Sequence, residues 1–118
     1  MDPGHLKIRA KHYEAQIIST ANKYSLDPAL VSAIIHTESC FNPRARSQAP
    51  AFGLMQLMPK TAAREAYKFL HNEEKILSPD DLYDPDNNIL LGATYLHMLH
   101  TRYFSKIKSA ENRRTLAI

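Results

Sequence analysis

A single glutamate at the end of an apolar helical stretch is the residue best placed to do chemistry. Glu38 follows Ile34 by four residues and Ile35 by three, and these isoleucines share a helical face with Leu30 and Val31. The spacing therefore predicts that Glu38 lies on the buried side of the helix. Burial disfavours the charged form of a carboxyl group, and the negative end of the helix dipole acts in the same direction. A carboxyl that stays protonated near neutral pH suits a general acid; the alternative is a structural Glu that reaches water or an arginine at a helix end.

The residues after Glu38 add a polar loop and a second candidate binding group. Asn42-Pro43 ends the helix, because the residue before a proline is disfavoured in the α region. Residues 44–52 form an irregular loop, and the apolar segment 53–59 contains one polar side chain, Gln56. An unpaired amide in an apolar setting costs about 1–3 kcal/mol, so Gln56 needs protein partners or a ligand. An acid, a polar loop and an amide in one stretch suggest one side of a cleft for a polyhydroxylated ligand.

Three motifs in this order resemble the catalytic domain of the soluble lytic transglycosylases. They are Glu-Ser-Cys-Phe-Asn-Pro at 38–43, Ala-Phe-Gly-Leu-Met-Gln-Leu-Met-Pro at 51–59 and Gly-Ala-Thr-Tyr-Leu at 92–96, accompanied by Ser47 and Thr61-Ala62. Within the family, residues 5–16 and 82–99 look most like the membrane-bound lytic murein transglycosylase C type. The resemblance implies an all-α, lysozyme-like fold similar to goose-type lysozyme.

The resemblance also implies roles for individual side chains. Glu38 would act as acid and then base, Ser47 would hydrogen-bond near it and the sugar, and Gln56 and Met58 would contact substrate. Tyr95 is a further candidate to line the cleft through its hydroxyl. Each has a structural alternative: a loop serine, a core methionine and a core tyrosine.

The reaction implied is cleavage of the β-1,4 bond between N-acetylmuramic acid and N-acetylglucosamine in peptidoglycan strands, closing a 1,6-anhydro ring. An ordinary glycosidase uses two carboxylates. The aspartates at 80, 81, 84 and 86 stand beside prolines or at helix starts, where capping is the expected role. A goose-type lysozyme-like hydrolase remains an alternative. A non-catalytic glycan-binding fragment is the other, because the family's Ala-Tyr-Asn-x-Gly motif has no match here and the domain looks truncated at its C-terminus.

Hydrophobic periodicity predicts four helices, with a polar excursion at 71–81, a flexible polar stretch at 105–112 and the start of another helix-like segment at 111–118. The expected helices cover residues 5–24, 28–39, 59–70 and 84–103. Asp27 should cap the second helix, with Pro28 at its first position. Gly92 inside the fourth helix predicts a close packing contact.

Composition fits one soluble globular domain over residues 1–118, with 44% hydrophobic and 23% charged residues. The net charge of +3 is spread along the chain, which gives little support to nucleic acid binding. No cofactor is expected, and no His or acidic pair shows metal-ligand spacing. The single cysteine, Cys40, is expected to be a buried, inert thiol. The chain shows no signal peptide or transmembrane run, so the periplasmic or cell-envelope location and a possible membrane anchor outside this sequence rest on the resemblance.

Overall fold

The computed structural model describes residues 3–116, which form helices joined by loops. The helices are α1 (Pro3–His12), α2 (Glu14–Lys23), α3 (Pro28–Ser39), α4 (Ala62–His71), α5 (Pro79–Tyr83) and α6 (Pro85–Leu116). The only β-type pairings in this part of the chain are isolated bridges of Phe52 with Arg46 and with Leu57. The predicted all-α fold is confirmed.

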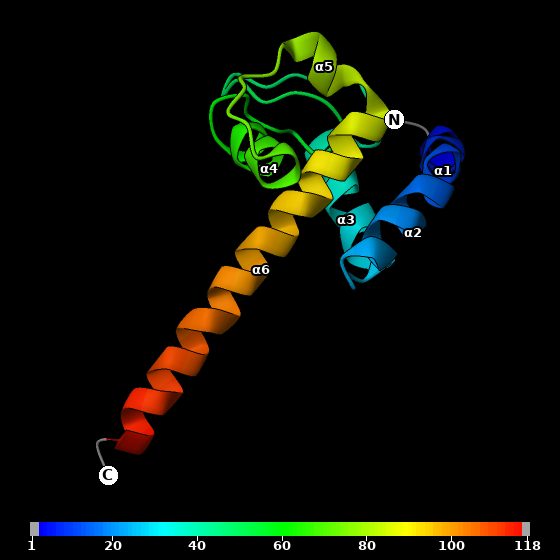
Figure 1. The fold of residues 1–118 in the computed structure, drawn as a ribbon. Helices are drawn as coiled ribbons and strands as arrows, with labels where there is room; N and C mark the ends of the chain where they lie inside the picture. The colour runs from blue at the N-terminus through cyan, green and yellow to red at the C-terminus, as the bar shows by residue number, and fades with distance from the viewer. Residues whose placement is uncertain (1–2, 117–118) are drawn as a thin grey trace.

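Helix α6 is the element around which the others pack. Its first half contacts α2, α4 and α5, and its second half extends away from the remaining helices (Figure 1). Helices α1, α2 and α3 lie on one side of this first half, and α4 and α5 lie on the other. The long segment between α3 and α4 crosses from one group to the other.

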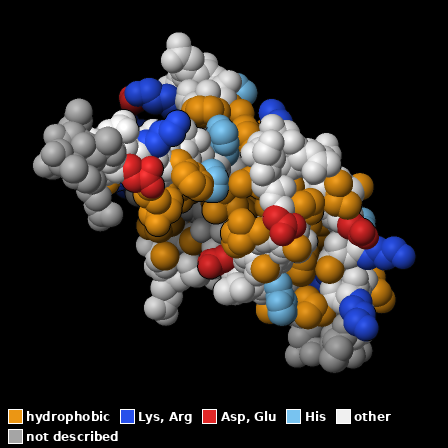
Figure 2. All heavy atoms as spheres, turned by 90° about the horizontal axis from the view of Figure 1, so that it is seen from below, with side chains coloured by type: hydrophobic (Ala, Val, Ile, Leu, Met, Phe, Trp, Pro, Cys, Tyr) orange, Lys and Arg blue, Asp and Glu red, His pale blue; other side chains and the backbone are white. Residues whose placement is uncertain are grey.

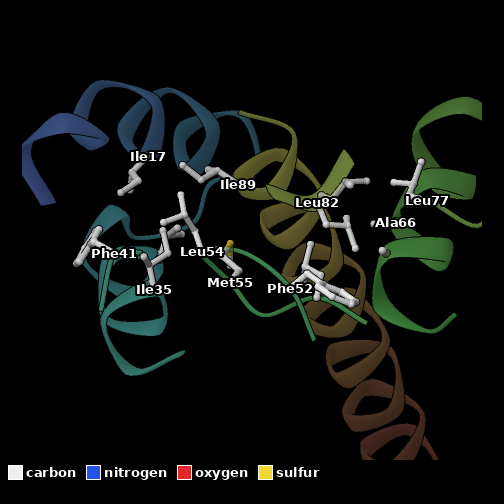
Figure 3. Close-up of a cluster of buried hydrophobic side chains, with 14 of the residues drawn as sticks. Ile17, Ile35, Phe41, Phe52, Leu54, Met55, Ala66, Leu77, Leu82 and Ile89 are labelled. Carbon is white, nitrogen blue, oxygen red and sulfur yellow. The ribbon is translucent and has the colours of Figure 1, made fainter. Parts of the chain in front are cut away.

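The hydrophobic core joins these two groups through that crossing segment (Figure 3). Ile17, Ile35 and Ile89 pack on one side, and Leu82 and Ala66 pack on the other. Leu54 and Met55 lie between them, on the crossing segment. Gly92 of α6 lies against the side chain of Met55, which a Cβ at this position would displace. The close contact predicted for Gly92 is confirmed.

Helices α3, α5 and α6 begin at capping residues of the sequence. The Asp27 carboxylate accepts a hydrogen bond from the Ala29 amide at 2.9 Å, and Pro28 opens α3 as predicted. The Asp84 carboxylate accepts from the Asn87 amide at 3.1 Å at the start of α6. Ser78 and Asp81 form a reciprocal capping box on α5. The capping roles expected for Asp81 and Asp84 are therefore confirmed.

Several element boundaries differ from the prediction. The helix expected over residues 5–24 is broken at Tyr13, and the break lets Leu6 and Ala10 of α1 pack against the core. Helix α4 begins at Ala62 instead of 59, and the polar excursion contains α5. The stretch 105–112, expected to be flexible, continues α6, because no glycine or proline interrupts the chain after Gly92. The helix-like segment predicted for 111–118 is the end of α6, and its residues 117–118 lie outside the described residues.

Large hydrophobic side chains remain exposed on the described surface, notably Leu30 at 48%, Phe69 at 53% and Tyr103 at 63%. Figure 2 shows one face of the molecule, on which hydrophobic side chains gather over a broad area with histidine and acidic side chains among them. Within residues 3–116, no helix is both long and apolar enough to cross a membrane.

Candidate active site

Glu38 occupies the last turn of α3 and is exposed, so the predicted burial of its side chain is wrong. The buried row of α3 is Val31 and Ile35, and this row continues four residues later to Ser39 instead of Glu38. Glu38 belongs to the neighbouring row, with Ile34 half-buried and Leu30 exposed. The carboxyl group therefore stands at the edge of the buried face, on a side open to solvent.

Ser39 fixes the end of α3 against the crossing segment. Its hydroxyl oxygen lies 2.7 Å from the carbonyl oxygen of Leu54 and 3.1 Å from that of Ile35. The hydroxyl can thus bond to the crossing segment as well as to its own helix. This contact sets the distance between Glu38 and the turn that carries Gln56.

The segment 52–57 is a tight turn closed by two backbone hydrogen bonds between Phe52 and Leu57, each 3.0 Å long. Gly53 and Gln56 both take positive φ angles, +80° and +52°. The Gln56 amide nitrogen donates to the carbonyls of Ala45 at 3.0 Å and Gly53 at 2.9 Å. The partners predicted for this embedded amide are therefore backbone carbonyls, and no bond to its side-chain oxygen is found within residues 3–116.

Asn88 holds the same turn from α6. Its side chain is fully buried; the carboxamide oxygen accepts from the Met55 amide at 2.8 Å, and the nitrogen donates to the carbonyls of Phe52 and Leu82 at 3.0 and 2.8 Å. Gly53 makes room for it, because a Cβ on Gly53 would lie 2.3 Å from the Asn88 side-chain nitrogen. Phe52, a bulky residue in the loop motif, is buried in the core and packs edge-to-face on Tyr83.

The three remaining candidate residues lie on different segments: Ser47 in the loop after α3, Met58 beside the Gln56 turn and Tyr95 on α6. Ser47 is exposed, and its hydroxyl accepts from the amides of Ala49 at 3.4 Å and Ala51 at 3.2 Å, which shapes the loop. Met58 is half-buried at the end of the Gln56 turn. Tyr95 is half-buried on α6 and borders a cavity beside α4. The structure thus groups Gln56 and Met58 on one turn and places Tyr95 on a separate element.

Two polar residues of the site region were given no role from the sequence. Ser39 and Asn88 both connect the turn 52–57 to a helix; Ser39 stands inside the motif at 38–43 and Asn88 inside the stretch 82–99 that resembles the family. Each is a polar residue in line with the buried residues of its helix, and this pattern is the signal that could have identified them. Cys40 is only half-buried, so the expectation of a buried thiol is corrected; it ends α3 with a φ of +50°.

Comparison with known proteins gives the family. The model of the transglycosylase SLT domain matches residues 15–114. This chain belongs to the SLT transglycosylase family. It is 39% identical over 116 residues to proteins named membrane-bound lytic murein transglycosylase C from Yersinia pestis and Yersinia pseudotuberculosis. The alignment covers 98% of this chain and 32% of each relative, so the chain spans about a third of their length.

Solved structures of the SLT family show the same fold. An inactive mutant of the lytic transglycosylase Slt from Pseudomonas aeruginosa superposes with a TM-score of 0.67 and 37% identity, over 75% of this chain and 14% of that one. The 70 kDa soluble lytic transglycosylase from Escherichia coli gives a TM-score of 0.68 and 30% identity, over 77% and 14%. The lysozyme-like fold expected for this SLT domain is therefore confirmed.

Proposed function

We propose that this chain is the part of a peptidoglycan lytic transglycosylase that carries the catalytic acid, Glu38. The observation that carries the proposal is the anchoring of the α3 end, through Ser39, to the turn that presents Gln56 and Met58. One carboxyl group and one amide-bearing turn would thereby contact the same glycan strand. Family membership supplies the substrate class, the glycan strands of peptidoglycan.

In the proposed reaction, Glu38 acts twice. It first donates a proton to the glycosidic oxygen between N-acetylmuramic acid and N-acetylglucosamine, and the bond from that oxygen to C1 of the muramyl sugar breaks. The Glu38 carboxylate then accepts the proton of the muramyl C6 hydroxyl, whose oxygen forms a bond to C1. The product is a 1,6-anhydro ring, Glu38 ends protonated as it began, and no water is consumed.

The exposure of Glu38 sets a condition on this mechanism. A general acid that works near neutral pH requires an environment that disfavours its charged form. A glycan strand lying on the exposed side of α3, along Leu30 and Ile34, would remove water from the carboxyl group on binding. We therefore propose that the Glu38 carboxyl group loses its water only when a glycan strand is bound.

The other candidates take supporting roles in this proposal. The free side-chain oxygen of Gln56 is available to accept from a sugar hydroxyl or amide, while its nitrogen stays bonded to the loop. Met58 offers an apolar surface to a sugar ring. Ser47 retains its hydroxyl hydrogen for donation to the sugar, since it accepts from backbone amides. The Tyr95 hydroxyl would bind at the edge of the site.

The cell envelope is the proposed location, because the relatives are named as membrane-bound murein enzymes and peptidoglycan is the proposed substrate. A membrane anchor would lie outside this sequence. We further propose that residues 1–118 act as one domain, since the hydrophobic core is continuous from α2 to α5.

The test is mass spectrometry of the fragments released from purified peptidoglycan by the wild-type chain and by Glu38→Gln. Release of anhydromuramyl ends is expected from the wild type, and we expect Glu38→Gln to lower it by about 10²–10⁴-fold, the usual contribution of a general acid–base group. Glu14→Gln, a matched change at an exposed site on α2, should release as much as the wild type.

Two other outcomes separate the alternatives. Reducing ends, one water heavier than the anhydro product, would identify a lysozyme-like hydrolase. Cosedimentation with peptidoglycan without any release would identify a glycan-binding fragment.

A further inference from the structure

A cavity of about 540 Å³ lies between α4 and α6, beside the candidate site. Three cationic side chains line it: Arg64 and Lys68 of α4, and Lys60 of the turn that precedes α4. Arg64 and Lys68 are four residues apart, which places them on one face of the helix. Tyr95 of α6 forms the opposite side.

The cations of this cavity exceed the carboxylates that neutralise them. Arg64 and Lys68 share one carboxylate, that of Glu74, with nitrogen-to-oxygen distances of 3.4 Å each. The other lining acid, Glu65, pairs with Arg102 of α6 at 3.7 Å. Lys60 has no carboxylate within 4.0 Å among the described residues.

The internal ion pairs are weak enough to be exchanged for a ligand. The side chains of Arg64, Lys68 and Glu74 are 43%, 59% and 59% exposed, and exposed pairs at such distances contribute little. Hydrogen bonding and attraction from Lys68, followed by Arg64, nevertheless lower the pKa of Glu74, which shows that this carboxylate lies in a positive field. An incoming anion would experience the same field.

Two hydroxyl groups complete the lining. Thr61 precedes α4, and its side chain makes no capping hydrogen bond. The Tyr95 hydroxyl likewise has no hydrogen-bond partner within the described part of the chain. Both can donate to an anion that the cations attract.

We propose that this cavity binds carboxylate groups of the peptide stem that peptidoglycan carries on its muramyl sugars. This inference rests on the proposed function and adds to it a site for the peptide. The cavity adjoins the turn proposed to contact glycan, since the Thr61 amide donates to the carbonyl of Met58 at 3.3 Å. A stem attached to a muramyl sugar at that turn would extend toward α4. Its several carboxylates match a cavity whose three lining cations outnumber its two lining carboxylates, one of which is paired with Arg102.

Binding of a sugar-free stem tests the inference without requiring turnover. The probe is the tripeptide L-alanyl-γ-D-glutamyl-meso-diaminopimelate, titrated into the ¹⁵N-labelled chain and followed by NMR. We expect Lys60→Gln and Arg64→Gln each to raise the Kd about threefold, as for an exposed charge pair. Lys11→Gln makes the same change of charge on α1 and should leave the Kd unchanged.

A gain of affinity provides a sharper test than a loss. Glu74→Gln removes the carboxylate that competes for Arg64 and Lys68, so the tripeptide should bind about threefold more tightly to this variant. A role of these residues in folding alone would not produce tighter binding.

Three results would overturn the inference: no binding of the tripeptide, equal loss in Lys11→Gln, or equal binding of a tripeptide whose carboxylates are amidated. Inorganic phosphate that binds as tightly as the tripeptide would also overturn it and indicate a general anion site. The Glu38→Gln experiment is independent of this one: tripeptide binding without turnover would leave the stem site intact, and turnover without tripeptide binding would leave the proposed reaction intact.

Discussion

At the scale of single residues, the candidate site depends on polar side chains that hold backbone in place. Ser39 connects the end of α3 to Leu54, and Asn88 connects the turn 52–57 to α6. Neither residue takes part in the proposed chemistry. Each determines where a residue of the proposed chemistry lies, Glu38 in one case and Gln56 in the other.

We predict that Asn88→Ala destabilises the fold by about 3 kcal/mol. The substitution removes three buried hydrogen bonds and leaves one backbone amide and two carbonyls without a side-chain partner, each at a cost of about 1–3 kcal/mol if water does not replace it. Urea denaturation measures the free energy of unfolding. Asn22→Ala, the same change at an exposed site on α2, should cost less than about 1 kcal/mol; an equal cost in both variants would contradict the role assigned to Asn88.

At the scale of elements, capping residues fix the starts of α3, α5 and α6, and the buried row of a helix decides which of its faces packs inward. Helix α3 shows that both are needed to place a side chain. Asp27 and Pro28 fix the start of the helix, and Val31 and Ile35 fix the buried row. Glu38 then falls beside that row, at the edge of the core, where a ligand can reach it.

The capping box of α5 predicts a dependence of stability on pH. Hydrogen bonds from the Ser78 amide and then from its hydroxyl lower the pKa of Asp81 below its ordinary value of 3.8. A carboxyl whose pKa is lowered on folding stabilises the fold fully at pH values above its unfolded pKa, and this contribution is lost as the pH falls through the folded pKa. Asp81→Asn should therefore be less stable than the wild type at pH 7, by about 1 kcal/mol for loss of a capping interaction.

The difference in stability between wild type and Asp81→Asn should narrow below about pH 4, where the Asp81 carboxyl of the unfolded wild type begins to protonate. Urea denaturation at pH 7 and at pH 3 measures it. Asp80→Asn is the control, because Asp80 makes no side-chain hydrogen bond within the described residues. A difference that stays constant with pH would show that the charge of Asp81 has no part in the cap.

At the scale of the whole molecule, α6 divides into a packed half and an exposed half. Residues 88–94 are mostly buried against the other elements, whereas Leu99, Tyr103 and Phe104 are 41%, 63% and 52% exposed. The second half makes a long projection from the remaining helices (Figure 1). This second half is held mainly by its own backbone hydrogen bonds, and a helical segment without other support is only marginally stable in water.

We predict that backbone amides of residues 104–112 exchange with solvent at least about a hundredfold faster than those of residues 88–96, because local opening needs no loss of core contacts there. Hydrogen exchange followed by NMR at low protein concentration measures this difference. Equal protection of both halves at low concentration would contradict the exposed state of the second half. Protection that appears only at high concentration would show that copies of the chain cover it.

The sequence by itself determined the helical class, the start of α3, the caps at Asp81 and Asp84 and the close contact at Gly92. These features depend on neighbouring residues or on a regular period, so local chemistry is enough to predict them. The family followed from ordered motifs. The exposure of Glu38 and the break at Tyr13 were missed, because they depend on which faces are covered by segments distant in the chain. The continuation of α6 through residues 105–112 was missed because the polar composition of this stretch suggested flexibility, although no glycine or proline interrupts it.

Only the tertiary structure decided how the candidate site is held together. Ser39 meets Leu54 across 15 residues, and Asn88 meets Met55 across 33. A hydrogen bond over such a separation is set by how α3, α6 and the turn 52–57 pack, and no local pattern specifies its partner. The sequence therefore indicated which residues carry the proposed chemistry, and the packing of the core decided where each one lies.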